Sequence, residues 1–213
     1  MILGSAAASW SGRVLTRTIA DAENFRWVPL SVEILDHDIV TVYEPTVTTR
    51  QRVMKEEEGR ESENSDFCLA PIDDVIKAIG EGQMVVVMDD VSRENEGDLV
   101  CAARYCRETQ MATMIRYTSG ILCAPMKQDH AARLGLSPMV QNNTDKNRTA
   151  FTVSCDALLG STGVSASDRS LTFRLLGQSN THPEDLTRPG HVFPLIAKPG
   201  LLKERSGHTE ASV

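Results

Sequence analysis

The alternation of apolar and polar residues becomes regular only after residue 67. Isoleucine and valine recur at helical spacing between residues 72 and 79, behind Pro71 and with Asp73 and Asp74 in the first turn. Carboxylates near the start of a helix and glycines after its end are typical helix boundaries. The pattern therefore predicts an amphipathic helix, followed by a strand over the apolar run 84–88.

Short apolar runs and helical patterns continue along the rest of the chain. Residues 99–103 form a short apolar run, and strands are predicted within 120–124 and 149–155 and at the end of 188–195. Helices are predicted at 109–118, 127–134 and 167–176, and a polar connection at 178–187. Met111, Met114 and Ile115 share one face of the helix 109–118, where core packing is the favoured interpretation. Cys123 falls in a predicted buried strand, which favours a small hydrophobic residue over a nucleophile.

Residues 1–66 differ in character from the rest. Residues 21–49 allow no assignment, and residues 50–66 are almost wholly charged and polar, which predicts a linker that cannot bury enough apolar surface to fold alone. We expect a largely disordered N-terminal extension over 1–66 and one domain over 67–213. Residues 1–20 contain Arg13, Arg17 and no acid, so a mitochondrial location through a transit peptide is the alternative to a cytoplasmic one.

Composition narrows the range of partners. The 213 residues carry a formal net charge of −7 and a pI near 5.3, so no basic signature points to a nucleic acid or an anionic membrane. Five cysteines lie apart without a CxxC pair or a secretory signal, which disfavours zinc and disulfides and favours a reducing compartment. No apolar run approaches the roughly 20 residues that span a bilayer. Any anionic substrate must therefore be held by local groups.

The densest group of functional side chains lies in the loop predicted after residue 88. Asp89–Asp98 contains five carboxylates and Arg93. If this loop stays extended, Glu94, Glu96 and Asp98 point to one side. Their oxygens suit a hard cation such as Mg²⁺, which takes further ligands from water or substrate, and Arg93 can hold an anionic group beside it. The alternative is a solvated acidic turn.

Three later segments carry candidate binding groups. Residues 161–169 combine hydroxyls with a helix start, which suits an oxygen anion, although helix capping is the commoner use of such residues. His191 lies between a predicted turn and a predicted strand. It is either a general base or a histidine with a structural role. Residues 203–210 place a cation, a glycine, a histidine and hydroxyls together, which suits a phosphate beside a metal ion.

Six motifs in order resemble the 3,4-dihydroxy-2-butanone 4-phosphate synthase family of riboflavin biosynthesis. They are DDVSRENEGD at 89–98, IRYTSGILCAP at 115–125, PMVQNNTD at 138–145, STGVSASDR at 161–169, RPGHVFPL at 188–195 and RSGHTEA at 205–211. Each motif alone is weak evidence, but all six in one order are not expected by chance. The resemblance covers residues 71–213 and favours the metal pocket over the solvated turn.

The resemblance implies an α+β domain with a mixed sheet and surrounding helices, acting as a homodimer with sites near the subunit interface. It implies conversion of D-ribulose 5-phosphate to L-3,4-dihydroxy-2-butanone 4-phosphate and formate, with a pair of Mg²⁺ ions, or Mn²⁺, as cofactor. By motif, Glu94 and His208 would ligate the metal, and Asp98, His191 and Cys123 would be catalytic, Cys123 by lining the pocket. The expected substrate-binding residues are Arg93, Glu94, Asp98, Thr162, Asp168, Arg205, Ser206, Gly207, His208 and Thr209.

The chemistry of the family fits these residue types. Proton removal beside the ketone leaves an enediolate, whose charge adjacent Mg²⁺ ions stabilise. Asp98 and His191 are the expected acid/base groups that move protons in the later steps. His208 must be neutral at its ligating nitrogen, so metal affinity should fall at acidic pH.

The chain departs from the family after the HTEA motif. The family continues there with a helix, a strand and a catalytic glutamate, and no residue up to Val213 matches that glutamate. We therefore expect a truncated or mis-spliced synthase. The alternatives are a catalytically impaired member that only binds magnesium or sugar phosphate, and a fragment of a two-domain enzyme that also carries a cyclohydrolase.

Overall fold

The computed structural model describes residues 2–6, 25–34, 38–47, 70–89, 93–94 and 96–213. Three strands precede the predicted domain: β1 (Ile2–Ala6), β2 (Phe25–Ile34) and β3 (Asp38–Val47). The linker predicted at residues 50–66 lies outside the described residues. The expected disorder of the extension and the domain boundary near residue 67 therefore stay predictions.

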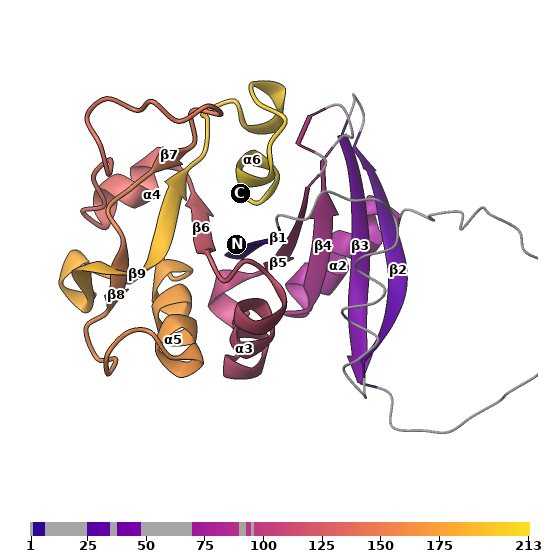
Figure 1. The fold of residues 1–213 in the computed structure, drawn as a ribbon, viewed down its shortest axis with the longest axis horizontal. Helices are drawn as coiled ribbons and strands as arrows, with labels where there is room; N and C mark the ends of the chain where they lie inside the picture. Colours follow the sequence, from indigo (N-terminus) through magenta and orange to yellow (C-terminus); the bar gives the residue numbers. More distant parts are fainter. Residues whose placement is uncertain (1, 7–24, 35–37, 48–69, 90–92, 95) are drawn as a thin grey trace, which may run out of the picture.

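A mixed seven-stranded sheet forms the centre of the molecule, as expected for an α+β domain (Figure 1). Its order is β4-β5-β1-β6-β9-β7, and β8 pairs with β9. Only β6 and β9 run parallel among the paired strands that the structure describes. The bounds are β4 (Met84–Met88), β5 (Gly97–Cys101), β6 (Leu122–Met126), β7 (Ala150–Phe151), β8 (Cys155–Ala157) and β9 (Leu186–Ile196).

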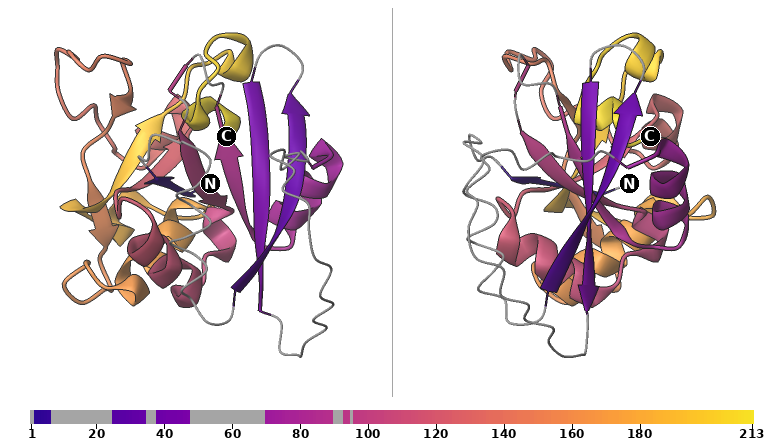
Figure 2. Two further views of the ribbon diagram at one scale, coloured as in Figure 1. Left: turned by 45° about the vertical axis from the view of Figure 1, so that its right-hand side comes forward. Right: turned by 90° about the vertical axis from the view of Figure 1, so that its right-hand side faces the viewer.

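Helices surround the sheet, and β2 and β3 form a separate antiparallel hairpin (Figure 2). The helices are α2 (Ile72–Gly80), α3 (Glu108–Tyr117), α4 (Gln128–Arg133), α5 (Ala166–Leu176) and α6 (His208–Ala211). The described residues also form the 3-10 turns η1 (Ala103–Tyr105), η2 (Pro183–Asp185) and η3 (Leu201–Lys203). Within the described part of the chain, no helix is long and apolar enough to cross a membrane.

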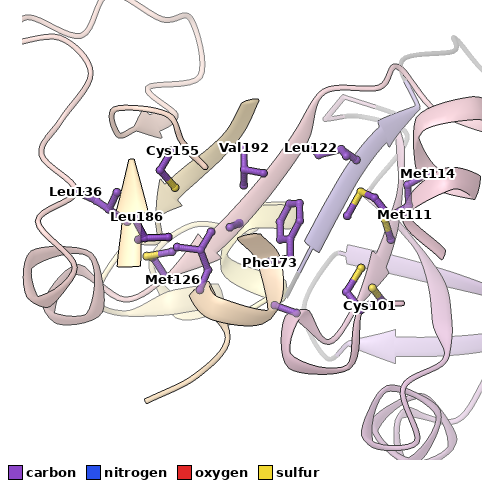
Figure 3. Packing of buried hydrophobic residues seen from close by; sticks show 14 of the residues in the cluster. Cys101, Met111, Met114, Leu122, Met126, Leu136, Cys155, Phe173, Leu186 and Val192 are labelled. Carbon is purple, nitrogen blue, oxygen red and sulfur yellow. The ribbon is translucent and has the colours of Figure 1, made fainter. Parts of the chain in front are cut away.

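Hydrophobic residues pack on both faces of the sheet. Met84 and Leu99 join a large cluster that contains Phe173 of α5, whereas their neighbours Val85 and Val100 join a second cluster with α2. Figure 3 shows part of the large cluster around Phe173. Because successive residues of a strand point to opposite faces, burial on both faces explains the unbroken apolar run of β4.

Met111 and Met114 are fully buried, which confirms that the methionines of α3 are core residues. The helix predicted after Pro71 is also confirmed, but its buried face is narrower than predicted. Val75 is buried, whereas Ile72 and Ile76 are 44% and 62% exposed. Helical periodicity identifies apolar positions but not how broad a face the neighbouring sheet covers.

Two strands differ from expectation. β9 begins at Leu186, within the stretch predicted to be a polar connection, because its first residues pair with β8. β1, in a region where no strand was predicted, lies between β5 and β6 and pairs antiparallel with both. Its register sets Ser5 opposite Asp98 and Leu3 opposite Cys123, so β1 joins the two strands that carry these candidate residues.

Candidate active site

The loop after β4 and the start of α6 bring three potential metal ligands together. Asp89, Glu94 and His208 each offer one ligand atom, and these atoms lie within 4.8 Å of one another. His208 Nδ1 lies 3.9 Å from Glu94 Oε2 and 3.8 Å from Asp98 Oδ2. The two predicted metal ligands, distant in sequence, are therefore neighbours in the fold.

Asp89 organises this loop from its buried position. Its Oδ2 accepts hydrogen bonds from Arg93 at 2.6 Å and from the Glu94 N–H at 3.1 Å, and its Oδ1 accepts from the Glu96 N–H at 2.9 Å. The chain consequently turns at Arg93 and Glu94 rather than staying extended. This role was not predicted from the sequence, although an aspartate that binds backbone N–H groups ahead of it is a known turn signal.

The local charge favours a cation. Burial raises the pKa of Glu96, and the negative charges of Glu94 and Asp98 raise it further, while the nearby His208 opposes them. Crowded carboxylates repel one another, and a bound cation relieves that repulsion. The acidic loop is thus a partly buried cluster of carboxylates, whose charge Arg93 compensates in part through Asp89 and Glu94.

The donor set fits a divalent metal ion. His208 is 8% exposed, and its Nε2 is buried without a hydrogen-bond partner among the described residues. An unpaired buried nitrogen is costly, and coordination is one way of satisfying it. Carboxylate oxygens suit Mg²⁺ and Mn²⁺, and imidazole is a ligand for many divalent ions.

A second loop reaches this cluster through Asn147. The Asn147 amide donates to Glu94 Oε1 at 2.5 Å, and the Asn147 carbonyl accepts from Arg205 at 3.4 Å. Asn147 was not predicted from the sequence, because nothing in its local pattern distinguishes it from other loop asparagines. The contact links the predicted metal ligand to the predicted phosphate-binding arginine.

Arg205 is held by a buried acid. Arg205 Nη1 donates to Glu210 Oε2 at 2.6 Å, and Glu210 Oε1 accepts from the Lys198 N–H at 3.0 Å. Glu210 is 3% exposed, whereas Ser206 is exposed and Gly207 to Thr209 are buried. The guanidinium of the predicted phosphate-binding segment is therefore held in place by Glu210.

Asp168, in the first turn of α5, organises the loop that precedes this helix. Its oxygens accept hydrogen bonds from the Ser161 hydroxyl and N–H, the Gly163 N–H and the Ser165 hydroxyl. The Ser161 hydroxyl, then the Ser161 N–H and the Ser165 hydroxyl, lower the pKa of Asp168 to about 2. Ser165 also caps α5 by accepting from the Asp168 N–H, which confirms the capping interpretation for that residue. Thr162 is exposed within this loop.

His191 lies on β9 with 45% of its side chain exposed. Its Nδ1 lies 2.7 Å from Asp156 Oδ2, and its N–H donates to Asp156 Oδ1 at 2.8 Å. Asp156 was not predicted from the sequence as a site residue. The available signal was a lone carboxylate next to a predicted β-rich segment, where an unpaired acid is costly.

Cys123 is buried on β6 at 8% exposure. Burial, with the charge of Asp98 as a second cause, raises the pKa of this thiol to about 12. The thiol therefore stays protonated near neutral pH and is a poor nucleophile, since the thiolate is the reactive form.

Comparisons with known proteins agree on one family. The profile of the 3,4-dihydroxy-2-butanone 4-phosphate synthase family matches residues 73–213. The synthase of Candida albicans is 48% identical over 144 residues, which cover 67% of this chain and 71% of that protein. The synthase of Helicobacter hepaticus is 49% identical over 142 residues, but the match spans only 40% of its length. For the riboflavin biosynthesis protein RibBA of Nocardia farcinica, the match is 52% identical and spans 34% of its length.

Solved structures of the same family share the fold. A 3,4-dihydroxy-2-butanone 4-phosphate synthase in complex with two magnesium ions matches with a TM-score of 0.66 and 49% identity, over 67% of each chain. A cation-free form matches with a TM-score of 0.62 and 47% identity, over 67% of this chain and 66% of that one. Motifs, geometry and both comparisons converge, and this chain belongs to the 3,4-dihydroxy-2-butanone 4-phosphate synthase family.

Proposed function

We propose that this protein converts D-ribulose 5-phosphate to L-3,4-dihydroxy-2-butanone 4-phosphate and formate in riboflavin biosynthesis. The meeting of Glu94 and His208 carries the proposal. These two residues match the family's metal ligands by motif, and the fold brings them within 3.9 Å from distant segments. The buried, unpaired His208 Nε2 supports a metal site at the same place.

Glu94 and His208 would hold Mg²⁺, which is the ion in one solved relative, with Mn²⁺ as the alternative. When bound, the metal supplies positive charge beside the oxygens of an enediolate. Arg93 would orient the sugar, and Arg205 with residues 206–209 would hold the phosphate. A guanidinium binds phosphate through two parallel hydrogen bonds, and Glu210 already fixes the orientation of Arg205.

Asp98 and His191 would move the protons. A carboxylate and an imidazole are suitable acid/base pairs when each lies within hydrogen-bond reach of the substrate. Cys123 would line the pocket as a neutral thiol, consistent with its raised pKa of about 12. Thr162 would contact the sugar, and Asp168 would act there by holding the Thr162 loop in shape.

We further propose that the protein acts as a homodimer. Leu158 and Leu159, between β8 and the Asp168 loop, are 55% and 90% exposed. A second copy would remove such apolar surface from water. Sedimentation velocity should give twice the mass of one chain, and a charged substitution at Leu159 should shift the protein towards monomer.

Formate release from ribulose 5-phosphate tests the activity. The wild-type chain with Mg²⁺ should release formate, and excess chelator should abolish release. His208→Gln should lower release about 100-fold or more, because loss of a direct ligand should cost at least as much as loss of a residue behind one, which costs about 10- to 100-fold. His182→Gln, at an exposed histidine directly before η2, is the matched control and should keep full activity.

A parallel assay on the chain extended by the C-terminal segment of the Candida relative separates two outcomes. Release only from the extended form would mean that the sites are correctly assigned but that the later glutamate is needed. Binding of Mg²⁺ by calorimetry without release from either form would contradict the synthase assignment and favour the alternative, an impaired member that only binds metal or sugar phosphate.

A further inference from the structure

Asp156 and His191 form a carboxylate–imidazole pair at a bulge between β8 and β9. Cys155 pairs with Val192, but Asp156 pairs with Thr187, so residues 188–191 of β9 have no counterpart on β8. Such bulges disrupt the ladder locally and re-aim a side chain. His191 stands at the end of this bulge.

The carboxylate of Asp156 replaces the missing ladder bond. It accepts the His191 N–H at 2.8 Å through Oδ1 and lies 2.7 Å from the His191 ring nitrogen Nδ1 through Oδ2. Two contacts from one side chain hold both the backbone and the ring of the histidine. Asp156 is 7% exposed, so this carboxylate has little access to water as a competing partner.

Two glycines leave room for the pair. A Cβ at Gly163, which has φ +85°, would collide with Asp156 Oδ2 and His191 Nδ1. A Cβ at Gly190 would overlap the backbone of Cys155. The loop organised by Asp168 therefore closes directly over the pair, and the bulge needs close approach of two backbones.

We propose that Asp156 is a positioning residue that keeps the proton on His191 Nδ1 and thereby makes Nε2 the nitrogen that accepts and returns protons. An ionised carboxylate has no hydrogen to donate, so at 2.7 Å the Nδ1 atom must carry it. The neutral ring then exposes an unprotonated Nε2. The catalytic part of this inference rests on the proposed function, whereas the tautomer does not.

Asp156→Asn tests the pair with little change of shape. The Asn oxygen can still accept the His191 N–H, but its amide donates where Oδ2 accepted. The ring must then present an unprotonated Nδ1 and a protonated Nε2. We expect kcat to fall about 100-fold or more, with KM for ribulose 5-phosphate within threefold, because the wrong tautomer cannot act as the base.

Long-range ¹H–¹⁵N NMR on the full chain reads the tautomer directly, with His191→Gln assigning the signal. At a pH where the ring is neutral, wild type should show a protonated Nδ1 and Asp156→Asn a protonated Nε2. Asp185→Asn is the matched control, since Asp185, in η2, accepts a hydrogen bond from the backbone N–H of His182. This substitution should alter neither the His191 signals nor the rate of formate release.

A proton on Nε2 of the neutral His191 ring in the wild-type protein would overturn the proposal. The NMR measurement on wild type requires neither enzyme activity nor a correctly folded Asp156 variant. A flipped tautomer in Asp156→Asn with kcat within threefold of wild type would overturn the catalytic part alone. Absence of formate release from wild type would instead count against the proposed function and leave the NMR result to decide the positioning role.

Discussion

At the scale of single residues, four buried acids hold other groups of the candidate site in place. Asp89, Asp156, Asp168 and Glu210 are 3–8% exposed, and each accepts at least two hydrogen bonds from segments that carry predicted site residues. Their oxygens are already occupied by protein donors. Through these bonds each acid holds a loop, a ring or a guanidinium in place, which is a role that residue type alone does not reveal.

Glu210→Gln should weaken substrate binding more than turnover. The glutamine oxygen can keep the Lys198 N–H, but the charge-assisted bond to Arg205 is lost. Such bonds contribute about 1.5–3 kcal/mol, so we expect KM for ribulose 5-phosphate to rise about tenfold with kcat changed less. Glu204→Gln removes an exposed neighbouring acid that accepts from Gly200 and serves as control. Equal KM values in the two variants would contradict the role of Glu210.

Cys123 should resist alkylation. With a pKa of about 12, its thiolate fraction at pH 8 is about 10⁻⁴, against roughly a quarter for an ordinary thiol, and burial limits access further. Iodoacetamide followed by mass spectrometry should leave Cys123 unmodified in the native protein and modify it after denaturation. Native labelling at the rate of free glutathione would show that the thiol is activated.

At the scale of elements, the first turn of α5 and the loop before it form one unit through Ser165 and Asp168. Ser165→Ala removes the N-cap and should cost about 1 kcal/mol of unfolding free energy, measured by urea denaturation. Ser167→Ala, at an exposed serine in the same turn, is the control. An equal loss in both variants would argue for a general effect of helix composition.

The same unit has a defined pH dependence. The pKa of Asp168 is lowered to about 2 in the folded protein. Its contribution to the free energy of unfolding is therefore complete above about pH 4, near the ordinary pKa of an aspartate, and is lost as the pH falls through about 2. The amide signals of Ser161 and Gly163 should titrate with that midpoint, and Ser165→Ala should raise it, since one stabilising hydroxyl is gone. A titration midpoint near pH 4 in the wild-type protein would show that these hydrogen bonds do not stabilise the Asp168 carboxylate.

At the scale of the whole molecule, β1 holds the sheet together. It is the only described strand between β5, which carries Asp98, and β6, which carries Cys123. Replacing Ile2–Ala6 by glycine and serine should leave two strand edges unpaired, lower the melting temperature and promote aggregation. Replacement by another β-prone segment should preserve both properties, since pairing uses the main chain. An unchanged melting temperature in the glycine variant would exclude β1 from the sheet.

Much of the local structure was predictable because its signals are local. The spacing in α2, the apolar run of β4 and the methionine face of α3 each predicted the correct element. The exposure of Ile72 and Ile76, the early start of β9 and the insertion of β1 were not predictable, because each depends on which surface a distant segment covers.

The sequence by itself determined the family, the order of most elements from residue 72 onwards and the residue types available for metal, phosphate and proton transfer, since the six motifs and the apolar periodicity are local properties of the chain. Only the tertiary structure decided that Glu94 meets His208, that Asp156 holds His191 and that Glu210 holds Arg205. Hydrogen bonds act over about 3 Å, and the distances that matter arise only when remote strands and helices pack.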